Sequence, residues 1–224
     1  MTAESFPKER GVTRLCHFTK LNNLVHIIDA DNGILASNAI RPDVKDPKDA
    51  ERYDGELNYV CCSIEYPNSW YLKKVQDRDE NQIFREWVVI YIDLAVLSHR
   101  SIKFCPCNAA KARGKFIKSN ISELSSLFAS PNIQCRRRPS QMLTCCPTDD
   151  QAEILIEDNI PFRFINGLAV CCEDDAKTVY SMLRCYGKDV PIYVAPDVLN
   201  TSWSQAIRNG VRPNEVLCQW KGDL

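Results

Sequence analysis

The sequence is poor in the features that mark membrane, secreted and strongly charged proteins. No apolar run approaches the roughly 20 residues that a membrane span needs. The opening stretch, MTAESFPKERGVTR, contains no hydrophobic core of a signal peptide. The formal net charge is −1, so no whole-molecule field favours a polyanionic or an acidic partner. We therefore expect a cytosolic protein without a membrane partner, in which any nucleic-acid surface is a local basic patch.

Histidine is scarce, and the cysteine spacing of a zinc site is absent. The three histidines are His17, His26 and His99. None of the 12 cysteines forms a C-x₂-C repeat. They include the sequence Cys105-Pro106-Cys107 and the adjacent pairs Cys61-Cys62, Cys145-Cys146 and Cys171-Cys172. Adjacent cysteines of a strand point to opposite faces, which makes them poor partners for one metal. We predict reduced core thiols and no metal site.

The composition is that of a soluble globular protein. A chain of 224 residues with 45% hydrophobic and 25% charged residues suits one domain, residues 1–224, with a sizeable core. Apolar, β-branched runs predict strands near 15–18 and at 59–64, 86–97, 152–157, 165–172 and 190–196. Helices are predicted to begin with Thr19 as a cap and at Glu173, where acidic residues fill the first turn. The sequence therefore predicts an α+β domain.

Polar segments separate these elements and carry most of the basic residues. We expect a long surface loop at 41–58 and a turn at 159–163. The stretch 108–128 has Lys111, Arg113, Lys115 and Lys118, and a loop at 132–150 carries Arg136, Arg137 and Arg138. The aromatic residues Tyr66, Trp70 and Tyr71 could form a stacking platform for bases. For each basic cluster the alternative is an ordinary solvated surface.

Gln151 and Glu153 stand at the entrance of the apolar strand predicted at 152–157. Because strand side chains alternate with a period of two, the two residues are expected to share a face. A carboxylate at the edge of an apolar surface costs desolvation energy unless something uses it. The alternative is a strand-edge pair that faces water.

Other candidate residues have ordinary explanations when taken singly. His17 can be a satisfied strand histidine, Thr19 a helix cap and Asn23 a solvated helix residue. Arg52, in the charged loop, can be a plain surface residue. Spacing alone does not bring these four residues together with Glu153.

Two sequence motifs, and their order along the chain, resemble those of the DarT family, whose members transfer ADP-ribose from NAD to bases of single-stranded DNA. The first is HFTKLNNLVHIIDADNGILAS, residues 17–37, in which a strand ending in His-x-Thr precedes an Asn-Leu helix closed by Gly. The second is QAEILIEDNIPFRFINGLAVCCED, residues 151–174. The resemblance spans about residues 12–195 and implies an ADP-ribosyltransferase-like split β-sandwich with flanking helices, which holds NAD in a cleft between two sheets.

The resemblance also implies a role for each candidate residue. Glu153 is the implied catalytic glutamate, which stabilises positive charge on the reacting ribose and takes a proton from the attacking base. His17, Thr19 and Asn23 are implied to hold the nicotinamide end of NAD. Arg52 is implied to lie near the NAD phosphates and the reacting centre. Residues implied to bind the nucleic-acid substrate are Gln151, Arg136, Arg137 and Arg138. Tyr71, from the aromatic group, is the further residue expected to bind it, by stacking.

The resemblance departs from the thymidine-modifying branch at YVCCSIEYPNSWYL, residues 59–72, which lacks that branch's Pro-x-Ser-Pro-Met stretch. Arginine reads guanine acceptors in a bidentate way better than it reads thymine, so guanine is the predicted base. The family implies a toxin with a macrodomain-type antitoxin as partner. The alternatives are a transferase that modifies RNA or protein, and a catalytically inactive module that binds NAD or nucleic acid.

Overall fold

The structure is a computed structural model that describes residues 8–29, 33–40, 53–78 and 86–219. Within these residues one hydrogen-bonded sheet has the strand order β10-β9-β8-β4-β1-β3-β6-β5, and β2 and β7 form a second, small sheet. The strands are β1 (Leu15–Lys20), β2 (Ile34–Leu35), β3 (Tyr59–Ile64), β4 (Trp87–Ile92), β5 (Ile102–Cys105), β6 (Glu153–Glu157), β7 (Asn159–Ile160), β8 (Ile165–Val170), β9 (Ile192–Val194) and β10 (Val216–Leu217). The α-helices are α2 (Leu24–Asp29), α3 (Ser69–Arg78), α4 (Val96–His99), α5 (Glu173–Cys185), α6 (Pro196–Leu199) and α7 (Trp203–Arg208).

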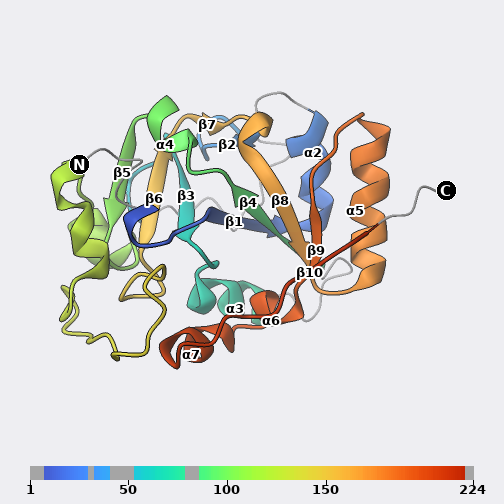
Figure 1. Ribbon diagram of the computed structural model, residues 1–224. Coiled ribbons are helices and arrows are strands. Elements are labelled where there is room, and N and C mark those ends of the chain that lie inside the picture. The colour runs from blue at the N-terminus through green and yellow to red at the C-terminus, as the bar shows by residue number, and fades with distance from the viewer. Residues whose placement is uncertain (1–7, 30–32, 41–52, 79–85, 220–224) are drawn as a thin grey trace.

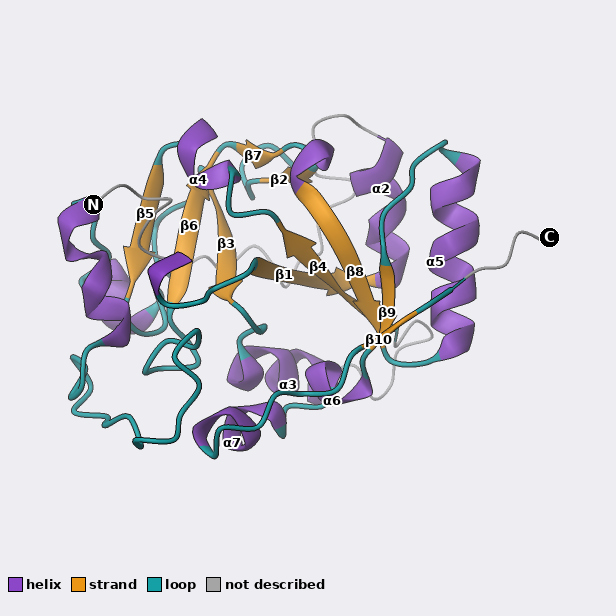
Figure 2. Cartoon of the chain, viewed as in Figure 1, coloured by secondary structure: helices purple, strands orange, loops and turns teal. Residues whose placement is uncertain are grey.

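The large sheet divides at β1. This strand pairs with β4 along its whole length, from Leu15 to Lys20. It pairs with β3 only at Leu15 and Cys16. Figure 2 shows β1 crossing the view while β3, β6 and β5 run at a large angle to it. The sheet therefore consists of two wings, β10-β9-β8-β4-β1 and β3-β6-β5, which separate beyond Cys16, as the predicted split architecture requires.

A network around Glu65 explains why the two wings join where they do. This buried residue follows β3 and has a positive φ of 65°. Its carboxylate accepts hydrogen bonds from the backbone amide of Thr13, at 2.8 Å, and from Arg212. Its backbone carbonyl accepts from Nε of Arg14 at 3.0 Å and from Sγ of Cys16. These contacts hold the start of β1 against the end of β3.

The main core extends over both wings. Residues Val88 to Ile92 of β4 are each at most 2% exposed, so both faces of this strand are covered, and the continuous apolar run is explained. Figure 1 places α2 and α5 together at one end of the molecule and α3, α6 and α7 together along one edge. A second, smaller core packs on the β3-β6-β5 wing and contains Tyr59, Cys105, Cys107, Ala109 and Leu155.

Two strand predictions were wrong in extent. The strand predicted at 86–97 ends at Ile92 and is followed by α4. The reason is Asp93, whose Oδ1 accepts a hydrogen bond from the backbone amide of Ala95 at 2.8 Å and so starts a turn. The predicted turn at 159–163 contains β7, which pairs with β2. Strand β5 was not predicted, although it pairs with the whole of β6 up to Ile156.

The first helix also begins later than predicted. Thr19 is a residue of β1, and the residue before the 3₁₀ turn Leu21–Asn23 is Lys20, which makes no side-chain cap. The prediction that Thr19 caps a helix was therefore wrong. Helix α5 was predicted correctly, with acidic residues Glu173, Asp174 and Asp175 in its first turn.

Among the cysteines, all of which lie in described residues, no disulfide forms. Six are buried: Cys16, Cys62, Cys105, Cys107, Cys145 and Cys146. Burial raises the pKa of the Cys16 thiol to about 12, so this thiol stays protonated at neutral pH. Cys135, Cys171, Cys172 and Cys185 are exposed, and for these four the prediction of core thiols was wrong. In the described part of the chain, no helix is long and apolar enough to cross a membrane.

Candidate active site

Glu153 lies across the sheet from the point at which the wings separate. Ser63 of β3 is the register partner of Cys16 on one side and of Glu153 on the other. Neighbouring strands lie about 4.8 Å apart, so the backbone of Glu153 is roughly 10 Å from β1. The residue after Cys16 is His17, where the two wings begin to diverge. The predicted catalytic residue and the predicted NAD-binding strand therefore meet at one place in the fold.

The side chain of Glu153 is only 9% exposed. It is the first residue of β6, and its Oε1 accepts a hydrogen bond from the backbone amide of Ala109 at 3.4 Å. Its cross-strand partners are Ser63 and Cys105. Burial raises the pKa of the nearby Cys62 thiol well above its usual value, so this neighbour stays neutral. A buried carboxylate in such surroundings interacts strongly with any positive charge that develops beside it.

Gln151 precedes β6 and does not belong to it. It lies in a turn in which the backbone amide of Gln151 donates to Oδ1 of Asp149 at 3.1 Å, and that of Ala152 donates to the Asp149 carbonyl at 3.0 Å. The prediction that Gln151 belongs to this strand was therefore wrong, and strand alternation does not apply to it. The turn sets the position of Gln151, and Asp149 holds the turn.

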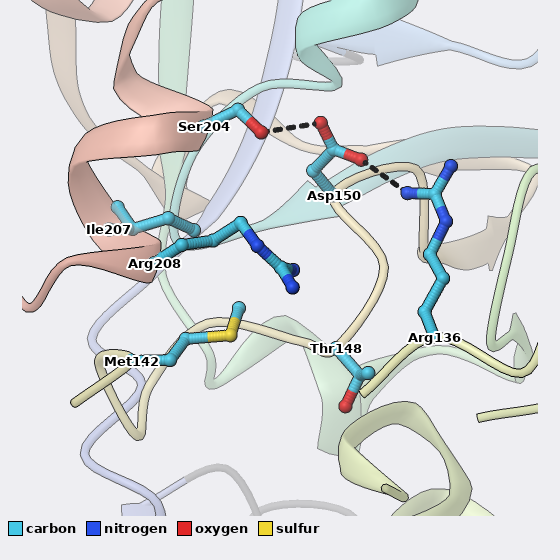
Figure 3. A pocket seen from close by; sticks show the side chains of 7 residues that line it. All are labelled: Arg136, Met142, Thr148, Asp150, Ser204, Ile207 and Arg208. Atoms are coloured by element: carbon cyan, nitrogen blue, oxygen red, sulfur yellow. Dashed lines mark hydrogen bonds and ion pairs between the residues drawn. The ribbon is translucent and has the colours of Figure 1, made fainter. Parts of the chain in front are cut away.

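The segment before Glu153 is attached to two distant helices. Asp150 Oδ2 accepts a hydrogen bond from Oγ of Ser69, at the start of α3, and one from Oγ of Ser204, in α7, at 2.9 Å. Arg136 Nη1 lies 3.2 Å from Oδ1 of Asp149. It also lies 3.4 Å from Oδ1 of Asp150 (Figure 3). These bonds fix the chain that enters β6. The sequence analysis did not predict these bonds. The two adjacent aspartates of TDDQAE, residues 148–153, were the feature that could have indicated them.

His17 bridges the two wings. Its Nδ1 lies 3.0 Å from the carbonyl oxygen of Cys61 in β3. Because a carbonyl only accepts, Nδ1 carries a proton. Two residues after His17 in β1, Oγ1 of Thr19 accepts a hydrogen bond from Nδ2 of Asn23, in the 3₁₀ turn, at 3.1 Å. His17, Thr19 and Asn23 are half-buried, and this polar group follows β1 along the open side of the split.

An aromatic group borders the same strand. The ring of Phe18 in β1 lies 5.8 Å from that of Tyr71 in α3 and 5.9 Å from that of Trp87 in β4. Tyr71 is 38% exposed and Trp70 is 51% exposed. Tyr66 is buried and packs on Trp203, so its expected place in a base-stacking platform was wrong. Tyr71 is the member that lies beside β1.

The three arginines predicted to bind nucleic acid differ in their surroundings. Arg138 donates to the carbonyls of Cys146, at 2.6 Å, and Leu143, at 2.9 Å, so its guanidinium holds the 132–150 loop together. Arg136 is paired with Asp149 and Asp150, as described above, and its side chain is 45% exposed. Arg137 is exposed.

Two of the other predicted basic residues also have polar partners. Lys118 is paired with Glu123, and Lys111 donates to Oε1 of Gln134, which belongs to the 132–150 loop. Arg52 and residues 41–52 of the predicted loop lie outside the described residues. Within the described ranges, no group of three or more His, Cys, Asp or Glu side chains is placed to hold a metal ion.

Comparison with known proteins agrees with this geometry. The family model named DarT, described as ssDNA thymidine ADP-ribosyltransferase, matches residues 16–200. A Thermus sp. 2.9 DarT in complex with ADP-ribosylated ssDNA has a TM-score of 0.63 at 16% identity and covers 84% of this chain and 96% of that one. The same protein in complex with NAD+ has a TM-score of 0.56 at 17% identity, covering 81% and 96%.

Thermosipho africanus DarTG in complex with ADP-ribose has a TM-score of 0.56 at 12% identity and covers 84% of this chain and 51% of that chain. At these identities the solved structures show a shared fold. No curated protein sequence matches the chain. The family model covers most of the chain, with the His17 and Glu153 motifs inside the match. The chain therefore belongs to the DarT family of NAD-dependent ADP-ribosyltransferases that act on single-stranded DNA.

Proposed function

We propose that Glu153 is the residue with which this chain transfers ADP-ribose from NAD to a base of single-stranded DNA. The observation that carries the proposal is the burial of this carboxylate at the start of β6, opposite the split between the wings. Breaking the bond between nicotinamide and ribose develops oxocarbenium character on the ribose carbon, which a fixed carboxylate stabilises. The electron pair of that bond leaves with nicotinamide. A base nitrogen then bonds to the ribose carbon and gives its proton to Glu153.

The NAD side of the site is assigned to β1 and the turn after it. His17, held in the split by its bond to the carbonyl of Cys61, is proposed to form a hydrogen bond with a ribose hydroxyl of NAD. The pair formed by Thr19 and Asn23 offers an amide and a hydroxyl to the nicotinamide end. Arg52 is proposed to meet the NAD phosphates, as the family resemblance implies.

The nucleic-acid side is assigned to the segment that leads into β6. Gln151 is proposed to orient the acceptor base, since Asp149 holds its turn and the neighbouring Asp150 is bonded to both α3 and α7. Tyr71 offers an exposed ring for stacking. Arg137, which is exposed, and Arg136, which is partly exposed, are proposed to contact the DNA. Arg138 is proposed to act by holding the loop that presents the other two.

The identity of the acceptor base remains a prediction. The description of the matching family model names thymidine as the modified nucleoside, whereas residues 59–72 depart from the thymidine-modifying pattern. The guanidinium of Arg138 is bonded within the loop. The guanine prediction therefore rests on Arg137 and on Arg136, and Arg136 must first release the carboxylates of Asp149 and Asp150. We propose guanine, with thymine as the alternative that the experiment below separates.

We further propose that the protein is the toxin of a toxin–antitoxin pair and acts in the cytosol. The support is the family membership and the DarTG of Thermosipho africanus, which has a similar fold. A macrodomain-type antitoxin is the partner that the family implies. The second candidate function is transfer to RNA or protein, because the Gln-x-Glu pattern alone does not specify the acceptor. An inactive NAD- or nucleic-acid-binding module is the third.

One experiment separates these functions. The protein is incubated with NAD labelled in its ADP-ribose part and, in parallel, with single-stranded DNA, double-stranded DNA, RNA or a bacterial lysate. We expect label only in single-stranded DNA. Oligonucleotides in which one of the four bases is the only candidate acceptor then identify the base. Label confined to thymine corrects the base and keeps the enzyme class, whereas label in RNA or protein alone overturns the proposal.

A further inference from the structure

A cavity of about 300 Å³ lies next to the chain that enters β6. Its lining comes from the 132–150 loop and from α7, as Figure 3 shows, and consists of Arg136, Met142, Thr148, Asp150, Ser204, Ile207 and Arg208. Asp150 precedes Glu153 by three residues, so their Cα atoms are at most about 11 Å apart. The cavity therefore adjoins the active site without including Glu153.

The cavity lies in a basic region of a chain whose net charge is only −1. The guanidinium groups of Arg10 and Arg138 lie over the ring of Phe128, at 5.3 and 5.8 Å from its centroid. Nη2 of Arg208 donates to the carbonyl of Arg137 at 2.9 Å. Burial and the nearby charges of Arg10 and Arg208 lower the pKa of Arg138. Together with Arg136 and Arg137, five arginines therefore lie in or beside the 132–150 loop.

The acidic residues described at the cavity are already engaged. Asp150 accepts hydrogen bonds from Ser69 and Ser204 and pairs with Arg136, and Asp149 pairs with Arg136 and accepts from the turn amide. Arg208 has a different position: Figure 3 shows its guanidinium directed into the space between Asp150, Thr148 and Met142. Its bond to the Arg137 carbonyl uses one of the five N–H donors of the group. The region therefore carries an excess of positive charge beside an open volume.

The apolar part of the lining points to more than an isolated anion. Met142 and Ile207 form one side of the cavity, opposite Asp150 (Figure 3). A cavity of this volume, with one apolar side and the guanidinium of Arg208 directed into it, suits a flat apolar ring attached to a phosphate. NAD has the same chemistry, but the proposed function assigns it to β1 and the turn after it, so the DNA strand is the substrate expected beside Gln151.

We propose that this cavity binds a nucleotide that neighbours the acceptor base, with its phosphodiester on Arg208 and its base against Met142 and Ile207. The inference rests on the proposed function, since the bound strand is the one that presents a base to Glu153. It gives the enzyme a second point of contact with the DNA, which selects for sequence or strand position independently of the reacting base.

The test is a double-mutant cycle between protein and DNA, measured by fluorescence anisotropy without NAD, so that no transfer occurs. The probes are short fluorescent single-stranded oligonucleotides, each with one phosphodiester replaced by an uncharged methylphosphonate. We expect Arg208→Gln to weaken binding of the unmodified strand about tenfold and to reduce the log K against log salt slope by roughly 0.7. Arg208→Lys, which keeps the charge, is expected to retain most of the affinity. Arg184→Gln, an exposed arginine on α5, is the matched control.

At one position, the methylphosphonate is expected to weaken binding to the wild type by the same factor, about tenfold, as Arg208→Gln does. At that position it should not weaken binding to Arg208→Gln further, because both changes remove the same contact between Arg208 and a phosphodiester. Additive effects at every position, or unchanged binding by Arg208→Gln, overturn the proposal. If Arg208→Gln fails to fold, the wild type alone still tests the proposal. A wild type whose binding is insensitive to every methylphosphonate also overturns the proposal. A labelled-NAD assay is run in parallel. DNA binding that depends on Arg208 without label transfer contradicts the proposed function alone, and label transfer without Arg208 dependence contradicts this inference alone.

Discussion

Nδ1 of His17 lies 3.0 Å from the carbonyl oxygen of Cys61, and this bond joins two strands that are no longer paired at that point. It holds the imidazole in the split between the wings and fixes the ring's tautomer. The NAD-binding role proposed for His17 depends on this placement.

Replacing His17 by alanine is therefore expected to raise KM for NAD about tenfold or more, which corresponds to about 1.4 kcal/mol of lost binding. The measurement is NAD turnover against single-stranded DNA at varied NAD. His99→Ala is the matched control, because Nδ1 of His99 also donates to a backbone carbonyl, that of Ala95 at 2.9 Å, but on α4. Equal NAD affinity for both variants would remove His17 from the NAD site.

Asp150 is expected to act as a positioning residue. Asp150→Ala leaves the hydroxyls of Ser69 and Ser204 without their shared acceptor and should cost about 1–3 kcal/mol in the free energy of unfolding. Because Asp150 connects the entry of β6 to two helices, kcat should fall while KM for NAD stays near the wild-type value. Thermal unfolding and steady-state kinetics measure the two effects, with Asp189→Ala, an exposed aspartate, as control. An unchanged kcat would show that the helix attachments do not position the site.

Tyr71 provides a test of the stacking role. It is 38% exposed, and Tyr186, at the end of α5, is 39% exposed, so the two form a matched pair. Tyr71→Ala should weaken single-stranded DNA binding by about 1–3 kcal/mol, the value typical of a lost base stack, and Tyr71→Phe should retain it. Tyr186→Ala should have no effect. Anisotropy titration measures all three, and a similar loss for Tyr71→Phe would assign the role to the hydroxyl.

The loop arginines are expected to separate by function. Arg138→Ala removes bonds to two backbone carbonyls and should lower the free energy of unfolding by about 1–3 kcal/mol. Arg137→Ala should leave stability within about 0.5 kcal/mol and reduce the salt slope of DNA binding by roughly 0.7. Urea unfolding and salt-dependent anisotropy distinguish the two. The opposite pattern would contradict the proposed division of roles.

The sequence predicted those parts of the fold that depend on local pattern. The apolar run of β4, the strand that follows Gln151 and the helix from Glu173 were all predicted, because burial of alternating or continuous apolar residues leaves a clear signal. Short edge elements such as β5 leave little signal, because the four residues Ile102–Cys105 owe their conformation to pairing with β6.

The motifs name Glu153 and His17 as candidates, and these assignments stay predictions. The attachment of Asp150 could not be predicted, because it depends on Ser69 and Ser204, which lie 81 and 54 residues away in the chain. Contacts of this kind come from tertiary packing, and no periodicity in the sequence marks them. The same holds for the turn at Asp149, which moved Gln151 out of the strand.

The central claim is that Glu153 performs the transfer, and Glu157 offers a close control on the same strand. The two glutamates lie four residues apart in β6 and therefore on one face. Glu157 Oε1 lies 3.5 Å from the hydroxyl of Tyr59, away from the split. The most direct measurement is the rate at which label passes from NAD to single-stranded DNA with the wild type, Glu153→Gln and Glu157→Gln, each verified by thermal unfolding. We predict a loss on the order of 10² or more for Glu153→Gln and a rate near that of the wild type for Glu157→Gln. A folded Glu153→Gln variant with wild-type transfer would contradict the account.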